Sequence, residues 1–222
     1  MTEPVAAPRP AWMERISSEL ESGHPEYFRA FAPPKGWHRR SAVLMLFAPG
    51  PGGEEVVLTE RSEHLRSHPG QVAFPGGSME DQDRTPVDAA LREAHEEAGI
   101  DPSGVDVALA LPELFLTPSQ QTVTPVLAWW PVPGEVHAAD PMEVARAARV
   151  RVRELVDPAR RFTVTHPAGF RGPGFEVDGL FVWGFTAMLL STVLDVAGLA
   201  PEWDESVERP LPARLASPWM RR

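Results

Sequence analysis

The chain has 222 residues, of which 43% are hydrophobic and 23% are charged, so it is long and apolar enough to bury the core of one globular domain. It contains no cysteine, which excludes disulfides and thiolate metal sites. Its formal net charge of -10 argues against general binding of nucleic acid, whose phosphate backbone requires a basic surface.

Neither the N-terminus nor the most apolar stretch has the pattern of a membrane or export segment. Residues 1–10 are rich in proline and alanine and are expected to be disordered, without the apolar region of a secretory signal. Residues 179–194 carry no charge, but they are fewer than the roughly 20 apolar residues of a membrane span, and Gly184 interrupts them. We therefore expect a cytoplasmic protein that does not bind membranes.

Residues 11–200 read as one domain in which helices and strands alternate. Helices are predicted at residues 11–21, from Thr85 to Ala98, and from Trp183 to about Gly198. Strands are predicted at residues 41–47, 55–59, 71–74, 105–116, 122–131, 162–165 and 175–182. This order predicts an α/β fold with a mixed sheet between helices, followed by a loose tail at 201–222. Trp129 and Trp130 are interpreted as core and edge packing rather than a base-stacking platform, and Trp183 is interpreted as a core aromatic.

The helix after Thr85 has an apolar stripe and an acidic arc. Pro86 follows the Thr85 cap, and Gly99 follows the last turn. The stripe, spaced to pack on a sheet, consists of Val87, Leu91, Ala94 and Ala98. At 3.6 residues per turn, Glu93, Glu96 and Glu97 fall within one arc, so their carboxylates are predicted to converge on one small volume.

Two interpretations of this acidic arc are open. It is a solvated surface in which Arg92 pairs with Glu96 at i, i+4, or it is a site for a divalent cation such as Mg2+, which prefers hard oxygen ligands. The preceding loop, Phe74-Pro75-Gly76-Gly77, favours the cation, because glycines let a phosphate or metal approach the main chain. His95 lies on the same helix away from the glutamates and is interpreted as a packing or surface residue.

A basic segment stands directly before this loop and contains Arg61, His64, Arg66 and His68. Because Lys35 is the only lysine of the chain, cationic recognition here relies on guanidinium groups, which suit bidentate contacts with phosphate. The alternative is a solvated surface in which Glu60 and Glu63 neutralise the arginines.

These residues resemble the signature of the Nudix hydrolases. Its Arg-Glu-apolar-any-Glu-Glu-any-Gly-apolar part is matched by Arg92, Glu93, Ala94, Glu96, Glu97, Gly99 and Ile100. One position departs from it: Asp83 stands where the family has a glutamate, and eight residues rather than seven separate it from Arg92. The role of that glutamate is therefore not assigned to Asp83.

The upstream segment is similar to a second signature, that of the coenzyme A diphosphatase branch of this family. Its fixed positions are matched by Leu58, Thr59, Arg61, Ser62, Arg66, Gly70, Phe74, Pro75, Gly76 and Gly77. The block Trp183-Gly184-Phe185-Thr186-Ala187 also resembles one near the end of that branch. The resemblance covers about residues 41–199 and implies a Nudix α/β/α sandwich.

The resemblance also implies an activity and a set of site residues. The activity is Mg2+-dependent hydrolysis of a diphosphate bond in coenzyme A or acyl-CoA, which gives 4'-phosphopantetheine (or its acyl form) and adenosine 3',5'-bisphosphate. Glu93 and Glu97 would hold the metal first, with Glu96 as a further or outer ligand, Glu143 as an acid from a later loop, and Arg92 orienting Glu96. Substrate would contact Arg61, Arg66, Gly70, Gly76 and Gly77. Mn2+ in place of Mg2+ and a homodimer are compatible with the resemblance.

Two alternatives remain at the level of sequence. The first keeps the fold and replaces coenzyme A by ADP-ribose or another nucleoside diphosphate derivative. The second is a nucleotide-sensing module that has lost catalysis; the complete set of Glu93, Glu96 and Glu97 argues against it, and the departure at Asp83 leaves it open.

Overall fold

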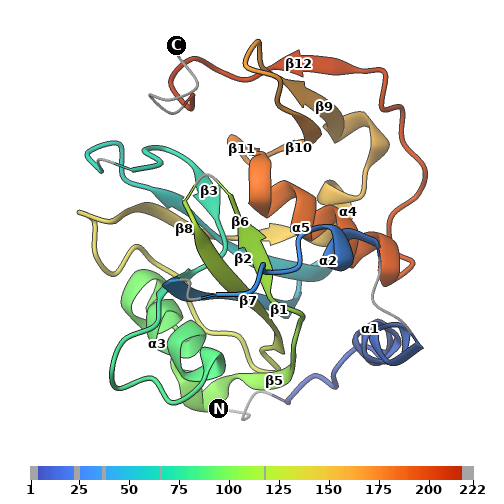
Figure 1. Ribbon diagram of the computed structural model, residues 1–222. Coiled ribbons are helices and arrows are strands. Elements are labelled where there is room, and N and C mark those ends of the chain that lie inside the picture. The colour runs from blue at the N-terminus through green and yellow to red at the C-terminus, as the bar shows by residue number, and fades with distance from the viewer. Residues whose placement is uncertain (1–4, 23–25, 37–38, 66, 118, 217–222) are drawn as a thin grey trace.

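A computed structural model describes residues 5–22, 26–36, 39–65, 67–117 and 119–216 (Figure 1). The helices are α1 (Ala11–Ser22), α2 (Glu26–Ala30), α3 (Pro86–Ala98), α4 (Val152–Leu155) and α5 (Gly184–Val196), with short 3-10 turns η1 (Pro102–Gly104) and η2 (Pro158–Arg160). The strands are β1 (Arg39–Gly50), β2 (Gly53–Arg61), β3 (Val72–Ala73), β4 (Gly76–Ser78), β5 (Asp106–Ala110), β6 (Leu114–Leu116), β7 (Gln121–Trp129), β8 (Val144–Arg151), β9 (Arg161–Thr165), β10 (Arg171–Val177), β11 (Leu180–Val182) and β12 (Glu208–Pro210).

The strands form a larger and a smaller sheet. The larger sheet has the order β3-β2-β1-β7-β5, with β4 paired to β1, β6 to β7 and β8 to β2. It is mixed, because β1 and β7 run parallel whereas β1 and β2 are antiparallel. The smaller sheet has the order β11-β10-β9-β12. This confirms the α/β class with a mixed sheet.

The alternation of side chains along β1 explains why helices cover both faces of the larger sheet. Alternate residues of β1, among them Leu44 and Leu46, pack with the alanines of α3. The residues between them, Met45 and Phe47, pack with α5 and α1 on the other face. Figure 1 shows α3 and α5 on opposite sides of the sheet, which is the predicted α/β/α sandwich.

The divergence of β1 from β2 creates the place for the glycine loop. β1 pairs with β2 only along residues 47–50, whereas residues 41–43 pair with β4. The backbone N–H of Leu44 donates to Pro75 O at 2.8 Å, which fixes the loop between the two strands. From the other side, the buried Thr186 hydroxyl of α5 donates to Val72 O of β3 at 3.0 Å. The glycine loop is therefore held between β1 and β2, and the strand that precedes it, β3, is fixed by α5.

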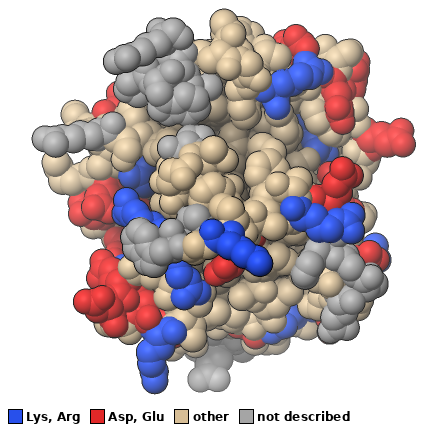
Figure 2. Space-filling view, in the orientation of Figure 1, with Lys and Arg blue, Asp and Glu red and all other residues tan. Residues whose placement is uncertain are grey.

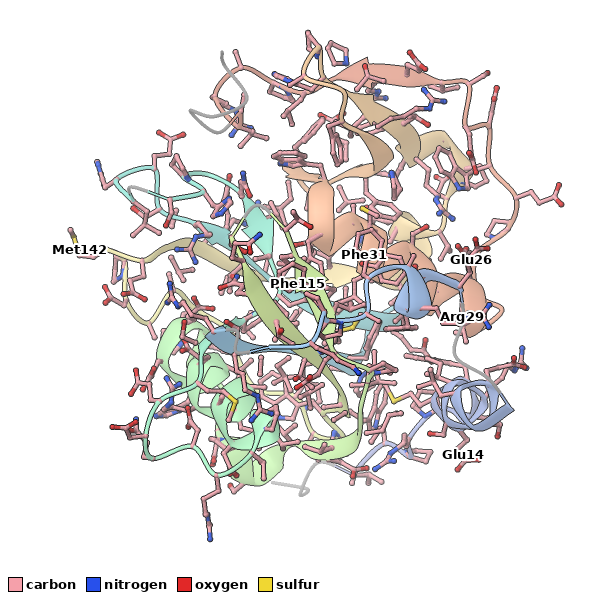
Figure 3. The ribbon with its side chains drawn as sticks, in the orientation of Figure 1. Glu14, Glu26, Arg29, Phe31, Phe115 and Met142 are labelled. Carbon is pink, nitrogen blue, oxygen red and sulfur yellow. The ribbon has the colours of Figure 1, made fainter. Side chains whose placement is uncertain are left out.

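Several predicted elements differ from the structure. The predicted strand 105–116 is divided into β5 and β6, and the predicted strand 175–182 is part of a β10–β11 hairpin that turns at Asp178 and Gly179. Helices α2 and α4 and strand β8 were not predicted. After α2, Phe115 N–H donates to Phe31 O at 2.7 Å, and Figure 3 shows these two residues near one another. Trp129 and Trp130 are buried, as expected of core residues.

The expected disorder at the N-terminus and looseness at the C-terminus are wrong for parts of both segments. Ala7 donates its backbone N–H to Pro131 O and accepts a hydrogen bond from the Trp129 indole, each at 2.9 Å. Near the other end, β12 pairs with β9 in parallel, and Leu215 is buried. Backbone pairing and apolar burial hold these segments despite their proline content. Residues 1–4 and 217–222 lie outside the described part.

In the described part of the chain, no helix has both the length and the apolar character that a membrane crossing requires.

Candidate active site

Helix α3 is built to end close to the glycine loop. At its start, the Thr85 hydroxyl accepts from the backbone N–H of Asp88 while the Asp88 carboxylate accepts from the backbone N–H of Thr85, which forms a capping box. At its end, Gly99 takes the left-handed conformation (φ 69°). Four buried alanines (Ala89, Ala90, Ala94 and Ala98) face the sheet. Because these side chains are small, the helix lies close to the strands and its glutamates reach β4.

Glu97 is the most buried acid of the helix, at 5% exposure. Its Oε2 accepts the backbone N–H of Gly76 at 3.1 Å. Burial, assisted by the negative charges of Glu93 and Glu143, raises the pKa of Glu97 to about 7, against the opposing effects of the Gly76 hydrogen bond and the positive charge of Arg61. Glu97 is thus a carboxylate that can bind a cation and whose position is fixed by a main-chain hydrogen bond.

Glu93 lies one turn before Glu97 and fills space that a side chain at Gly77 would occupy. A Cβ placed on Gly77 would lie 2.2 Å from Glu93 Oε1. The Glu93 side chain is 14% exposed, and burial raises its pKa. At Gly76 a Cβ would lie 2.4 Å from Ala42 O. Both positions therefore require glycine, because Gly76 lies against the backbone of β1 and Gly77 lies against the Glu93 carboxylate.

Arg92 ties the helix to the β4 end through a dense set of hydrogen bonds. It donates to both carboxylate oxygens of Asp83 (3.2 and 2.9 Å), to Ser78 O (3.1 Å), to Glu93 Oε1 (3.0 Å) and to Glu96 Oε2 (2.9 Å). The Asp83 side chain is 3% exposed, and its hydrogen bonds from Arg92 lower its pKa. The bidentate pair makes Asp83 the anchor of Arg92, a role that sequence reasoning did not assign.

The three glutamates of α3 do not converge as predicted. Glu96 is 56% exposed and pairs with Arg92, whereas Glu93 and Glu97 face the glycine loop. Among the described residues, no group of three or more His, Asp or Glu side chains is gathered as a metal site. The helical arc did not predict this difference, because Glu96 lies on the exposed side of the helix, where it pairs with Arg92 at i, i+4. His95 Nδ1 lies 3.1 Å from Ile100 O, away from the loop.

The basic segment lies beside the buried acids. The charge of Arg61 lowers the pKa of Glu97, and the Arg61 Nε is buried without a hydrogen-bond partner in the described part of the chain. The backbone of Gly70 (φ 66°) donates to Arg61 O at 3.1 Å, so this glycine closes the turn behind Arg61. Burial, and then the charge of Arg61, lowers the pKa of His68. Arg66, a predicted substrate contact, lies outside the described residues.

Glu143 approaches the same acids from the loop before β8. Its charge raises the pKa of both Glu93 and Glu97, and its carbonyl accepts the backbone N–H of Ser62 at 2.8 Å. The neighbouring Met142 is 68% exposed and points away from the body of the molecule in Figure 3. The predicted loop acid thus lies near the two helix acids, and its backbone is bonded to the residue that follows Arg61.

A cavity of about 510 Å3 opens beyond the end of β4. Its lining includes Lys35, Arg40, Met79, Glu113 and Thr122. Arg40 and Glu113 form an ion pair of 3.4 Å at its wall. On the face shown in Figure 2, basic and acidic residues are interspersed rather than gathered in one basic area. The cavity is of the size that small ligands occupy.

Comparison with known proteins agrees with this fold. The NUDIX domain family matches residues 37–168, more than half of the chain. "Uncharacterized Nudix hydrolase NudL" of Escherichia fergusonii is 38% identical over 173 residues, which cover 74% of this chain and 85% of that protein. NudL of Escherichia coli strain K12 has the same identity and coverage. A Nudix hydrolase of M. smegmatis, RenU, shares the fold, with a TM-score of 0.53 at 23% identity over 79% of this chain and 98% of that one. The chain therefore belongs to the Nudix family and is a Nudix hydrolase.

Proposed function

We propose that this Nudix hydrolase cleaves the diphosphate bond of coenzyme A or acyl-CoA, giving 4'-phosphopantetheine or its acyl form and adenosine 3',5'-bisphosphate. The observation that carries the proposal is the position of Arg61, a residue of the coenzyme A diphosphatase signature. Its charge acts on the buried Glu97, and its Nε has no hydrogen-bond partner in the described chain. A guanidinium beside an acid that can hold a cation suits a substrate with several phosphates.

The donor set at the glycine loop fits a divalent cation. Glu93 and Glu97 supply hard carboxylate oxygens, and the missing side chain at Gly77 leaves room for one of them. Burial raises the pKa of both acids, the charge of neighbouring carboxylates such as Glu143 raises it further, and a bound cation would relieve that repulsion. Glu93 and Glu97 would hold Mg2+ or Mn2+, with Glu143 nearby and Glu96 as an outer group. When bound, the cation supplies charge neutralisation and a more acidic water.

The residues of the chain have separate tasks in this proposal. The Gly76 N–H fixes Glu97, and Arg92, itself anchored by Asp83, fixes Glu93. Arg61 binds a phosphate oxygen of the substrate and offsets the negative charge that accumulates during hydrolysis. Water attacks phosphorus directly, so no side chain is needed as a nucleophile. Arg92 donates its hydrogen bonds to groups of the protein itself and is therefore a positioning residue.

The test is a substrate panel with identification of products. Coenzyme A, acetyl-CoA, dephospho-CoA, ADP-ribose and diadenosine tetraphosphate are incubated with the full chain in Mg2+ or Mn2+, and the products are separated by mass. The highest kcat/KM is expected for a coenzyme A compound, with 4'-phosphopantetheine or its acyl form as one product. A kcat/KM for ADP-ribose that exceeds that for every coenzyme A compound would replace the proposed substrate by a nucleoside diphosphate derivative.

A further inference from the structure

The C-terminal segment, residues 208–216, lies outside the part of the chain that matches the family, yet it is firmly attached. β12 pairs with β9, and Leu211 N–H donates to Thr165 O at 2.8 Å. Leu215 and Ala216 are 2% and 4% exposed and belong to a core cluster with Trp183. Its position is thus set by burial as well as by backbone hydrogen bonds.

This segment ends on the turn that bears the basic residues. The Gln71 side-chain amide donates to Leu215 O at 3.4 Å. A Cβ on Gly70 would lie 3.5 Å from Leu215 Cδ2 and 3.6 Å from Arg214 Nη1, so the Arg214 guanidinium rests against the Gly70 turn. Figure 1 shows the red segment after β12 returning toward the loop between β2 and β3. The Gly70 backbone N–H donates to the Arg61 backbone O, so the turn on which Arg214 rests is the one that closes behind Arg61.

The charge of Arg214 is not neutralised locally. Arg214 is exposed and forms no ion pair with the described residues, unlike Arg209 and Arg171 nearby, which pair with Glu176 and Glu208. Glu63 also lies at this turn, with its Cγ 3.9 Å from the Gly70 Cβ position, and it forms no ion pair with Arg214. In a chain of net charge -10, an exposed guanidinium without an ion pair, beside the turn that follows Arg61, favours an anionic ligand.

We infer that Arg214 is a further substrate-binding residue, which binds a phosphomonoester of the substrate remote from the scissile diphosphate, while Arg61 binds at the diphosphate itself. This inference rests on the proposed function, since coenzyme A carries such a group and dephospho-CoA does not. Leu215 holds the Gly70 turn in place, and Arg214 adds the charge. Specificity for the phosphorylated ribose would then come from outside the region that matches the family.

Binding of two nucleotides by the full chain tests the inference without turnover. Calorimetry compares adenosine 3',5'-bisphosphate with AMP for the wild type, Arg214→Ala, Arg214→Lys and Arg209→Ala. The wild type is expected to bind the bisphosphate more tightly than AMP. Arg214→Ala is expected to weaken bisphosphate binding about tenfold, the size of one charged hydrogen bond, and AMP binding much less. Arg214→Lys should recover part of the loss, and Arg209→Ala should bind as the wild type does.

The inference is overturned if Arg214→Ala binds the bisphosphate as tightly as the wild type, or loses both nucleotides equally. Melting temperatures of the variants control for folding, which an exposed side chain should not change. Wild-type binding that depends on Arg214 without hydrolysis of coenzyme A would support the inference while the proposed function fails. Hydrolysis of coenzyme A by the wild type, with bisphosphate binding unchanged in Arg214→Ala, would overturn the inference while the proposed function stands.

Discussion

Gly77 leaves room for the Glu93 carboxylate, and this fit gives a direct prediction. A Cβ there would lie 2.2 Å from Glu93 Oε1, so Gly77→Ala must displace that carboxylate. We expect kcat to fall at least about tenfold, as for loss of one precisely placed catalytic group, while the fold is kept. Gly134→Ala is the matched control, because its nearest atom would be 3.4 Å away on Trp130. Equal kcat for the two variants would exclude the proposed role of Glu93.

Asp83 anchors Arg92 through two hydrogen bonds and is nearly inaccessible to solvent. Asp83→Ala frees the guanidinium, which no longer fixes Glu93, so kcat is expected to fall about tenfold with a smaller change in KM. Asp81→Ala removes an exposed acid from the same turn and serves as the control. A Mg2+ titration of initial rates measures both variants, and unchanged kcat for Asp83→Ala would contradict the anchoring role.

At the level of single residues, the signature predicted which acids lie near the loop but not how each side chain points. Glu93 and Glu97 face the glycines as spacing on the helix predicted. Glu96 is exposed and pairs with Arg92, which is itself positioned by Asp83, nine residues away. A one-residue shift relative to the signature marked Asp83 as unusual, and only the folded turn shows its partner.

Helix α3 carries the acids, and its start is stabilised by one side chain. Thr85→Ala removes the Thr85 half of the capping box and is expected to lower the free energy of unfolding by about 1 kcal/mol. Thr192→Ala in α5 is the control, since its hydroxyl only donates to Met188 O within its own helix. Urea denaturation measures both variants. A larger loss for Thr192→Ala would show that the cap contributes little.

Strand β8 illustrates why some elements escaped prediction. Its sequence, VARAARVR, mixes small or apolar residues with arginines without regular alternation. No strand was therefore predicted there, although β8 pairs along most of β2. β12 escaped for a related reason, because ERP has little β-propensity and is held by pairing with β9. Both strands depend on a neighbour distant in sequence. The long apolar strands β1 and β7, by contrast, were evident from composition.

For the whole molecule, burial of Glu97 predicts how stability depends on pH. The pKa of Glu97 is raised from 4.5 to about 7 in the folded state, so the folded protein binds this proton more tightly than the unfolded chain does. The free energy of unfolding of the metal-free protein is therefore expected to fall as pH rises from 4.5 to about 7, by at most about 3 kcal/mol from this group. Glu97→Gln should lack this contribution.

Denaturation in chelator at pH 5 and pH 8 measures the difference. Glu97→Gln is expected to be more stable than the wild type at pH 8 and about equal at pH 5, because Gln keeps an acceptor for the Gly76 N–H without a charge. Glu202→Gln, at an exposed position, should follow the wild type at both values. An identical pH dependence for the wild type and Glu97→Gln would mean that Glu97 is solvated.

The general architecture was predictable because it depends on patterns that repeat along the chain. Alternating apolar strands and an amphipathic helix predicted the α/β sandwich. The second sheet and the docked C-terminal segment were not predicted, since they depend on tertiary pairing of short, proline-rich strands.

The most direct test of the account is binding of Mn2+ to the wild type and to Glu97→Gln, followed by electron paramagnetic resonance. We predict that the wild type binds Mn2+, that Glu97→Gln binds it on the order of tenfold or more weakly, and that Glu202→Gln binds it as the wild type does. Mn2+ binding by Glu97→Gln at wild-type affinity would contradict the assignment of the buried glutamates as holders of the cation.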